Sequence, residues 1–281
     1  MSVDLAAVPP AGPPTGPRVL LSNAPFHHRP LADAFAVAAE AGFDGLELMV
    51  TGDPQTQDAT AVARLATEHR LPVPVVHGPF LLLTRRVLGT DPLEKAVRTC
   101  TLARTLGADL VIVHPPFRWQ GTFRRWLADD ADAVGAAHGL RVAVENLYPI
   151  PLGAITPRLH TATEPVHLAA HRDVVLDTSH LAVTGVDLGA AWEHVGPRTA
   201  HLHVSDHDGG WGDRHLLIGD GMLPLDRLLG RVGRDVAAPS ITLELHLRRG
   251  LLDDRARLVR TLREQREQCL AMIGRPLRAA A

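Results

Sequence analysis

Residues 110–116 read LVIVHPP, residues 141–148 read RVAVENLY and residues 174–180 read VVLDTSH. Each segment contains a short run of aliphatic and mostly β-branched residues, preceded in the second by Arg141, and then reaches a histidine or an acidic residue. Short apolar runs of this kind are typical of strands buried on both faces of a parallel sheet. The three segments therefore predict strands whose carboxyl ends carry polar side chains.

The same alternation of apolar runs and helical patterns covers most of the chain. Strands are expected at Arg18–Ser22, Gly45–Met49, Val73–Val76, Leu110–Val113, Arg141–Val144, Val174–Leu176, Thr199–Val204 and Ser240–Leu245. Helical patterns between them include Leu31–Ala41, Pro92–Leu106, Thr122–His138 and Asp253–Met272. Glycines just past the last helical residue are expected to end three of these helices, at Gly42, Gly107 and Gly139.

Eight strands that alternate with helices predict an α/β fold, a (β/α)8 TIM barrel in a single domain. A doubly wound open sheet is the alternative. That fold would favour a glycine-rich phosphate turn after the first strand, where this chain reads SNAPFHH instead. We expect the barrel to span residues 18–275, after a flexible Pro/Gly-rich tail at residues 1–17 and before a short tail at residues 276–281.

Composition restricts the classes of function. A net charge of -2 over 281 residues weakens a nucleic-acid interpretation without excluding it, because a local basic patch can lie within a neutral total. No apolar run approaches the roughly 20 residues that span a bilayer, and no secretion signal is recognisable. Two cysteines, Cys100 and Cys269, offer no disulfide framework, so we expect a cytoplasmic protein. Lys95, which is the only lysine, is expected on a solvated helix surface.

Histidine and carboxylate side chains recur where the expected strands end. They are His77, His114, Glu145, Asp177 with His180, His201 or His203, and Glu244 or His246. Of the strand 7 pair, His203 lies nearer the carboxyl end and is the better ligand, whereas the spacing does not choose between Glu244 and His246. Because the carboxyl ends of barrel strands meet at one mouth, we expect these side chains to converge.

A glycine-rich segment after the seventh strand, SDHDGGWGDRHLLIGDG, adds Asp213 and His215 to this set. In an extended D-x-H segment both side chains lie on one side of the chain. Imidazole and carboxylate ligands without thiolate suit a divalent ion such as Zn or Mn. The residues therefore predict a divalent metal site, with one to three ions.

Several segments together resemble the xylose isomerase-like barrel superfamily, which includes sugar and sugar-phosphate isomerases and epimerases as well as endonuclease IV. The resemblance runs from about residue 18 to about residue 263. The segments that carry it are VHGPF, VIVHPP, VENLY, LDTSHLAVTG, HLHVSD, GDRHLLIGDG and LELH, in that order.

The resemblance implies a ligand set and catalytic residues. The epimerase-like ligands fall on Glu145, Asp177, His203 and Glu244, and in such enzymes the two glutamates flank the substrate and move a proton between its faces. The larger, endonuclease IV-like set also falls on His77, His114, His180, Asp213 and His215, so that all nine positions of a three-zinc pattern are filled. This larger set predicts metal better than it predicts the reaction.

Three functions are compatible with this pattern. The favoured one is an isomerase or epimerase of a small sugar, sugar phosphate or polyol, with Glu145 and Glu244 as the proton-transfer pair. Asn146, Arg118, Trp119, Trp211 and Arg214, on loops above the strands, are candidates to contact such a substrate.

The second function is an endonuclease IV-like phosphodiester hydrolase that cleaves at abasic sites, with phosphate contacts from Arg85, Arg86, Arg124 and Arg125. Endonuclease IV-like sequences, however, usually continue with Gly-Ser after the strand 4 histidine and with Asn-Thr-Ala-Gly after the strand 5 glutamate, where this chain reads HPPFRW and ENLYPIP. The lysine that xylose isomerases place beside the metal has no counterpart here.

The third function is a non-catalytic binding barrel. Apolar helix faces leave room for a homodimer.

Overall fold

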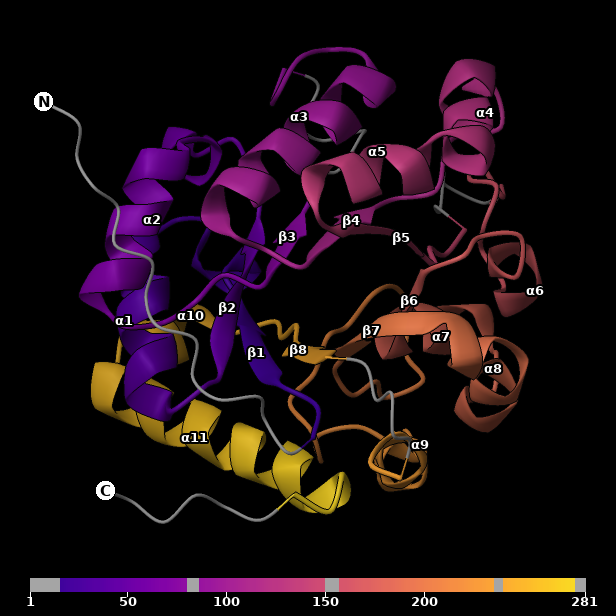
Figure 1. The fold of residues 1–281 in the computed structure, drawn as a ribbon. Helices are drawn as coiled ribbons and strands as arrows, with labels where there is room; N and C mark the ends of the chain where they lie inside the picture. The colour runs from indigo at the N-terminus through magenta and orange to yellow at the C-terminus, as the bar shows by residue number, and fades with distance from the viewer. Residues whose placement is uncertain (1–15, 80–85, 150–156, 235–239, 276–281) are drawn as a thin grey trace, which may run out of the picture.

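The computed structural model describes residues 16–79, 86–149, 157–234 and 240–275. Within these residues, eight parallel strands close into a barrel in chain order, and β8 pairs with β1. The strands lie in the middle of the molecule and the helices surround them (Figure 1). The predicted (β/α)8 TIM barrel, a single domain, is confirmed.

The strands are β1 (Val19–Ser22), β2 (Gly45–Met49), β3 (Val75–His77), β4 (Leu110–Val113), β5 (Arg141–Glu145), β6 (Val174–Asp177), β7 (Thr199–Val204) and β8 (Ser240–Leu243). The α-helices are α1 (Leu31–Ala41), α2 (Ala59–Glu68), α3 (Pro92–Leu106), α4 (Gly121–Asp129), α5 (Ala131–His138), α6 (Pro165–Leu168), α7 (Thr178–Thr184), α8 (Leu188–Val195), α9 (Leu225–Val232), α10 (Arg249–Leu252) and α11 (Arg255–Met272). Short 3-10 helices are η1 (Ala24–Phe26), η2 (Pro54–Gln57) and η3 (Gly196–Arg198).

The helix predictions are confirmed in part: the last helix begins at Arg255 rather than at Asp253, because Asp254 caps it. The helices α1 and α3 have the predicted bounds, and the glycines that follow α1, α3 and α5 have positive φ, as expected of a glycine that ends a helix. The single helix expected over 122–138 is wrong, because the chain forms α4 and α5 with a break at Asp130. Three aspartates within four residues explain the break, since Asp is a poor residue for a helix interior.

Strand boundaries shift by a few residues for identifiable reasons. The third strand was expected to begin at Val73 but begins at Val75, because Pro74 has no N–H to donate to the sheet. The strands β5 and β6 each extend by one residue and thus include Glu145 and Asp177. These two carboxylates therefore belong to the rigid barrel wall rather than to the loops above it.

The barrel interior changes from apolar to polar toward the carboxyl ends of the strands. Side chains of a strand alternate between its two faces, so residues two apart point the same way. Buried apolar residues fill the lower interior, and the next inward-facing residue on four strands is polar. These pairs are Val75 and His77, Ile112 and His114, Ala143 and Glu145, and Val175 and Asp177.

The outward faces of the strands carry the larger core. Residues such as Val76, Val111, Val144 and Leu202 are fully or almost fully buried against the helices. The long helix α11 packs along α1 and closes the ring beside β1 (Figure 1). This ring of helices holds the strands, and with them the polar layer at the carboxyl ends, in a fixed arrangement.

The remaining expectations about the fold concern the two tails, membrane-spanning helices and Lys95. Most of the predicted tail at 1–17, the tail at 276–281 and Arg85 lie outside the described residues. Among the described residues, no helix is both long enough and apolar enough to cross a membrane. The expectation that Lys95 is a surface residue is wrong: its side chain is buried, and Nζ donates to the backbone oxygen of Val87 at 2.5 Å.

Candidate metal centre

His203, on β7, lies at the centre of the polar layer. Its Nδ1 is 2.7 Å from a carboxylate oxygen of Glu145, 2.9 Å from one of Glu244 and 3.6 Å from one of Asp177. One ligand atom from each of these four residues lies within 4.8 Å of the others. The strands β5 to β7 and the residue that follows β8 thus bring together the four residues that the family resemblance implied as one ligand set.

Glu145 connects this cluster to strands β3 and β4. Its second carboxylate oxygen lies 3.2 Å from Nε2 of His77 and 3.3 Å from Nε2 of His114. His77, His114 and Glu145 form a second group whose ligand atoms could share an ion. All three side chains are buried, so the glutamate can bridge two adjacent ligand groups.

The remaining predicted ligands gather around Asp213. One of its oxygens is 2.7 Å from Nε2 of His215 and 3.3 Å from Nε2 of His180, and the other accepts a hydrogen bond from Ser179 at 2.5 Å. His180 and His215 also form a potential metal-binding group with Asp177. The nine predicted ligands therefore lie in one continuous cluster at the carboxyl ends of the strands.

Backbone carbonyls determine which nitrogen of three histidine rings can bind a metal. The Nδ1 atoms of His77, His180 and His215 lie 2.8 to 3.0 Å from the backbone oxygens of Gly78, Asn146 and Glu244, respectively. A carbonyl oxygen only accepts hydrogen bonds, so Nδ1 carries the hydrogen in each ring. Nε2 is then the nitrogen that offers a lone pair to an ion.

Asp177 supplies an independent indication that the donor set fits a cation. One oxygen accepts the backbone N–H of His180 at 2.9 Å and so caps α7, as expected of an aspartate at this position. The other oxygen is fully buried and has no hydrogen-bond partner among the described residues. Because an unpaired buried carboxylate oxygen is costly, its position among imidazoles and carboxylates fits a site that binds a divalent ion.

The pKa values of the cluster reflect its concentration of negative charge. Burial alone lowers the pKa of His203, but the carboxylates of Glu47, Glu244 and Glu145 outweigh it and raise that pKa well above its ordinary value. Burial raises the pKa of Glu145, yet the charge of His203 and hydrogen bonds from the histidines bring it well below the ordinary value. The cluster therefore stabilises positive charge at its centre.

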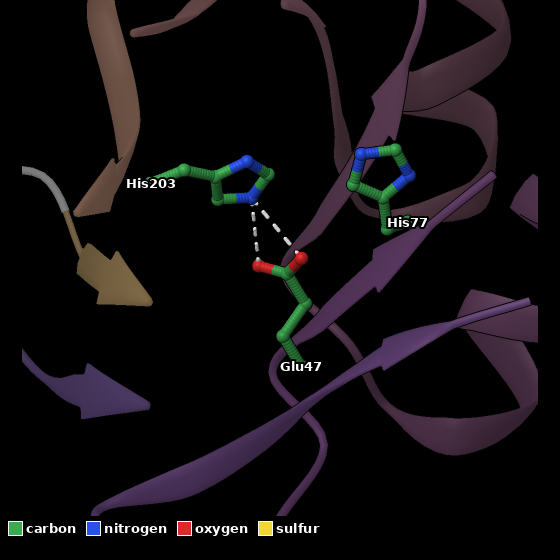
Figure 2. Close-up of side chains that lie close together, drawn as sticks. All are labelled: Glu47, His77 and His203. Carbon is green, nitrogen blue, oxygen red and sulfur yellow. Dashed lines mark hydrogen bonds and ion pairs between the residues drawn. The ribbon is translucent and has the colours of Figure 1, made fainter. Parts of the chain in front are cut away.

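One buried carboxylate, Glu47, was missed by the sequence analysis. It lies on β2, is fully buried, and its oxygens are 3.1 and 3.2 Å from Nε2 of His203 (Figure 2). Glu47, His77 and His203 form a further group of potential ligands. A signal existed in the segment GLELM, in which a charged residue interrupts an apolar strand, but Glu47 precedes the end of its strand.

The structure distinguishes the members of two ambiguous pairs. His201 lies below the cluster, as expected, where its ring contacts Ser240 Oγ at 2.7 Å and Thr242 Oγ1 at 2.9 Å. On the eighth strand, Glu244 reaches His203, whereas His246 is exposed to solvent.

A buried aspartate shapes the loop that carries Asp213 and His215. The carboxylate of Asp206 accepts backbone N–H groups from His207, Gly219 and Leu223 at 2.8 to 3.0 Å. The chain passes so close to it that a Cβ on Gly221 would collide with the carboxylate, which explains a glycine there. The sequence GDRHLLIGDG thus folds around Asp206.

The residues predicted to contact a substrate differ in their exposure to solvent. Asn146 is buried and bridges β5 to β6: Oδ1 accepts from the backbone N of Asp177 at 2.8 Å, and Nδ2 donates to its backbone O at 3.2 Å. Trp119 is 65% exposed and stacks on Phe117 at 4.7 Å between ring centres. Trp211 is 72% exposed. Their contact with a substrate stays a prediction.

The arginine candidates lie on the surface. Arg214 is exposed and pairs with Asp208 at 3.0 Å. Arg118 is exposed and donates to the backbone oxygen of Arg158 at 2.8 Å. The other arginines proposed for phosphate contact are exposed where described, at Arg86, Arg124 and Arg125.

Solved structures with the same fold include enzymes of two reaction classes. A 3-keto-D-glucoside 4-epimerase from E. coli matches with a TM-score of 0.67 at 17% identity, over 91% of this chain and 99% of that one. A D-tagatose 3-epimerase-like protein matches with a TM-score of 0.62 at 18% identity, over 89% and 99%. An AP endonuclease, family 2, from Brucella melitensis matches with a TM-score of 0.64 at 19% identity, over 83% and 94%. At these identities the similarity supports the fold alone.

Comparison at the level of sequence identifies the family of this chain. An uncharacterized protein of Mycobacterium tuberculosis is 35% identical over 227 residues, which cover 74% of this chain and 81% of that protein. One from Mycobacterium leprae is 35% identical over 226 residues, with the same coverage. A family model described as xylose isomerase-like TIM barrel matches residues 35–267. The chain belongs to the xylose isomerase-like TIM barrel family.

Proposed function

We propose that this protein is a metal-dependent isomerase or epimerase of a small sugar, sugar phosphate or polyol-like substrate. The observation that carries the proposal is the placement of Glu145 and Glu244. Glu145 ends β5 and Glu244 directly follows β8, with two strands between them, and both reach Nδ1 of His203, at 2.7 and 2.9 Å. A positioned carboxylate can accept or donate a proton, so two of them at one site would be able to move a proton between two faces of a bound substrate.

The metal would be Zn or Mn, with Glu145, Asp177, His203 and Glu244 as its ligands. Up to two further ions would be held by the groups around His77 with His114 and around His180 with Asp213 and His215. A bound divalent ion supplies Lewis acidity that acidifies the C–H bond beside a chelated carbonyl.

The two glutamates differ in a way that assigns them different tasks. The side chain of Glu145 is 1% exposed and is surrounded by histidines, whereas that of Glu244 is 13% exposed. Hydrogen bonding and the charge of His203 outweigh burial and hold both pKa values below the ordinary range, so both carboxylates are ionised and able to accept a proton. In our proposal one glutamate takes the proton and the other returns it, and Glu244 is the one that exchanges its proton with solvent.

Incubation with a panel of ketoses in deuterated water tests this function. We expect deuterium at the carbon beside the carbonyl, with loss of incorporation in Glu145→Gln and Glu244→Gln and full incorporation in the exposed control Glu68→Gln. Metal analysis of the same preparations separates loss of the ion from loss of the base. Wild-type protein that holds metal but gives no incorporation across the panel would contradict the proposal.

A second candidate, a phosphodiester hydrolase acting at abasic sites, is favoured by one observation. The nine positions of the larger ligand pattern lie in one continuous cluster, with Asp213 3.3 Å from His180 and 2.7 Å from His215. Clustered ions can stabilise both the attacking and the leaving oxygen of a phosphodiester. Cleavage of an abasic duplex by wild-type protein, abolished in Asp213→Asn and without deuterium incorporation into sugars, would establish this function in place of the first.

A further inference from the structure

The side chain of Glu47 lies beneath the proposed ligand set, on the opposite side of the His203 ring. Its two oxygens are 3.1 and 3.2 Å from Nε2 of His203 (Figure 2). Nδ1 of the same ring lies 2.7 Å from Glu145 and 2.9 Å from Glu244. Both residues are fully buried. Glu47 and His203 are 156 positions apart in the chain, and the closed barrel brings β2 and β7 together across its interior.

Glu47 is itself held by donors from two other strand positions. Thr242 Oγ1 donates to Oε2 of Glu47 at 2.7 Å, and Nε2 of His201 lies 3.0 Å from the same oxygen. Nδ1 of His201 contacts Ser240 Oγ at 2.7 Å. Nε2 of His203 also contacts Oε2, at 3.2 Å, so Oε2 receives all three contacts. Oε1 lies 3.1 Å from the same Nε2 and has no hydrogen-bond partner among the described residues.

His203 differs from the other histidines of the centre in the nitrogen that it presents. In His77, His180 and His215 a backbone carbonyl engages Nδ1 and leaves Nε2 for the ion. In His203 both ring nitrogens face carboxylates. Nδ1 faces Glu145 and Glu244, which belong to the proposed ligand set, and Nε2 faces Glu47, which lies outside it. With an ion bound by Glu145 and Glu244, Glu47 is the acceptor that remains for the hydrogen of the ring. An ionised carboxylate only accepts hydrogen bonds, so Nε2 of the neutral ring carries the hydrogen and Nδ1 carries the lone pair.

We propose that Glu47 is a positioning residue that makes Nδ1 the metal-binding nitrogen of His203. This inference rests on the proposed function, because it requires that His203 bind an ion. The carboxylate also increases the donor strength of the ring by accepting its N–H, as carboxylates behind metal-binding histidines do.

Glu47, His77 and His203 could instead hold an ion of their own. A neutral imidazole has one N–H and one lone pair, so His203 can serve one ion while Nε2 keeps its hydrogen. A separate ion on Nε2 would therefore need a ring that has lost both hydrogens. The hydrogen bond between Nε2 and Oε2 of Glu47, at 3.2 Å, favours a donating Nε2.

The variants Glu47→Leu and Glu47→Gln separate positioning from packing, because both nearly preserve volume and only the second keeps an acceptor. The contacts at Oε2 favour the amide oxygen of Glu47→Gln at that position, where Nε2 of His203 can still donate to it. In Glu47→Leu no acceptor holds the hydrogen on Nε2, so the ring no longer presents Nδ1 alone to the ion.

The experiment uses full-length protein labelled with 15N-histidine and loaded with 113Cd, which reports the bound nitrogen through cadmium–nitrogen coupling. The His203 signal is assigned with His203→Asn. We expect coupling at Nδ1 in wild-type protein and in Glu47→Gln, and loss of that coupling in Glu47→Leu. Competition with a chelator should give a Zn affinity about 10- to 100-fold weaker in Glu47→Leu, the range seen when a partner behind a ligand is removed.

Thr242→Val provides the matched control, since it removes a donor to Glu47 but keeps the contact between Glu47 and His203. Its Zn affinity should stay within about threefold of wild type, well below the loss expected on removing the partner itself. Coupling at Nε2 in wild-type protein, or wild-type Zn affinity in Glu47→Leu, would overturn the inference while the proposed function stands. Wild-type protein that takes up no metal would instead refute the proposed function.

Discussion

Replacement of Asp177 by asparagine tests whether the cluster is a metal centre. Asparagine retains the oxygen that caps α7, which accepts the backbone N–H of His180 at 2.9 Å, so the helix keeps its cap. What changes is the second oxygen, which is buried, lacks a hydrogen-bond partner among the described residues and lies 3.6 Å from Nδ1 of His203. We therefore expect a small effect on the metal-free protein and a large one on metal binding.

The expected change in Tm follows from the coupling between metal binding and folding, because an ion that binds only the native state stabilises it. A ligand present at 1,000 times its Kd stabilises the native state by about 4.1 kcal/mol. For a protein of this size that is a rise in Tm of about 8–16 °C, at about 2–4 °C per kcal/mol. Loss of one buried charged partner costs about 3–5 kcal/mol, roughly a 1,000-fold loss of affinity. At the same metal concentration the variant should keep only about 0.4 kcal/mol, or about 1–2 °C.

Thermal unfolding of chelator-treated protein, with and without added Zn or Mn, measures both quantities. Asp187→Asn is the matched control, because Asp187 also caps a helix, accepting the N–H of Ala190 at 2.9 Å, and is exposed outside the cluster. This control should show the wild-type response to metal. An equal metal-induced rise in Tm for Asp177→Asn and wild-type protein would refute the assignment of Asp177 as a ligand.

Three further outcomes are expected. A Cβ on Gly221 would collide with the buried carboxylate that organises its loop, so Gly221→Ala should lower the free energy of unfolding by about 1–3 kcal/mol in urea, whereas Gly250→Ala, which meets no atom within 4 Å, should not. Burial raises the pKa of the Cys100 and Cys269 thiols to about 12, so a thiol reagent at neutral pH should label neither in the native protein and both after denaturation. Burial lowers the pKa of His215, but Asp177 and Asp213 outweigh it and raise the pKa to about 9, so metal must displace a proton there. Calorimetry in two buffers should then detect proton release on metal binding, and the affinity should weaken as the pH falls below about 9; an affinity independent of pH would contradict this reasoning.

The sequence alone determined the barrel and its polar mouth. Both are encoded in local patterns: apolar runs that alternate with helical segments, and a histidine or carboxylate where an apolar run stops. In β4 the run LVIV and the His114 that follows it suffice to place the ring at the mouth, because all parallel strands of a barrel end at the same edge. For the same reason Glu145, Asp177 and His203 could be assigned to one site.

Only the tertiary structure decided how the site is completed. Glu47 precedes the end of its strand, so no rule about strand ends selects it, and its contact with His203 depends on closure of the barrel between β2 and β7. The choice of Glu244 over His246 likewise depends on where β8 stops and on which side chain then faces inward. A sequence pattern depends on residues that are close together in the chain, whereas closure of the barrel brings residues into contact that are far apart in the chain.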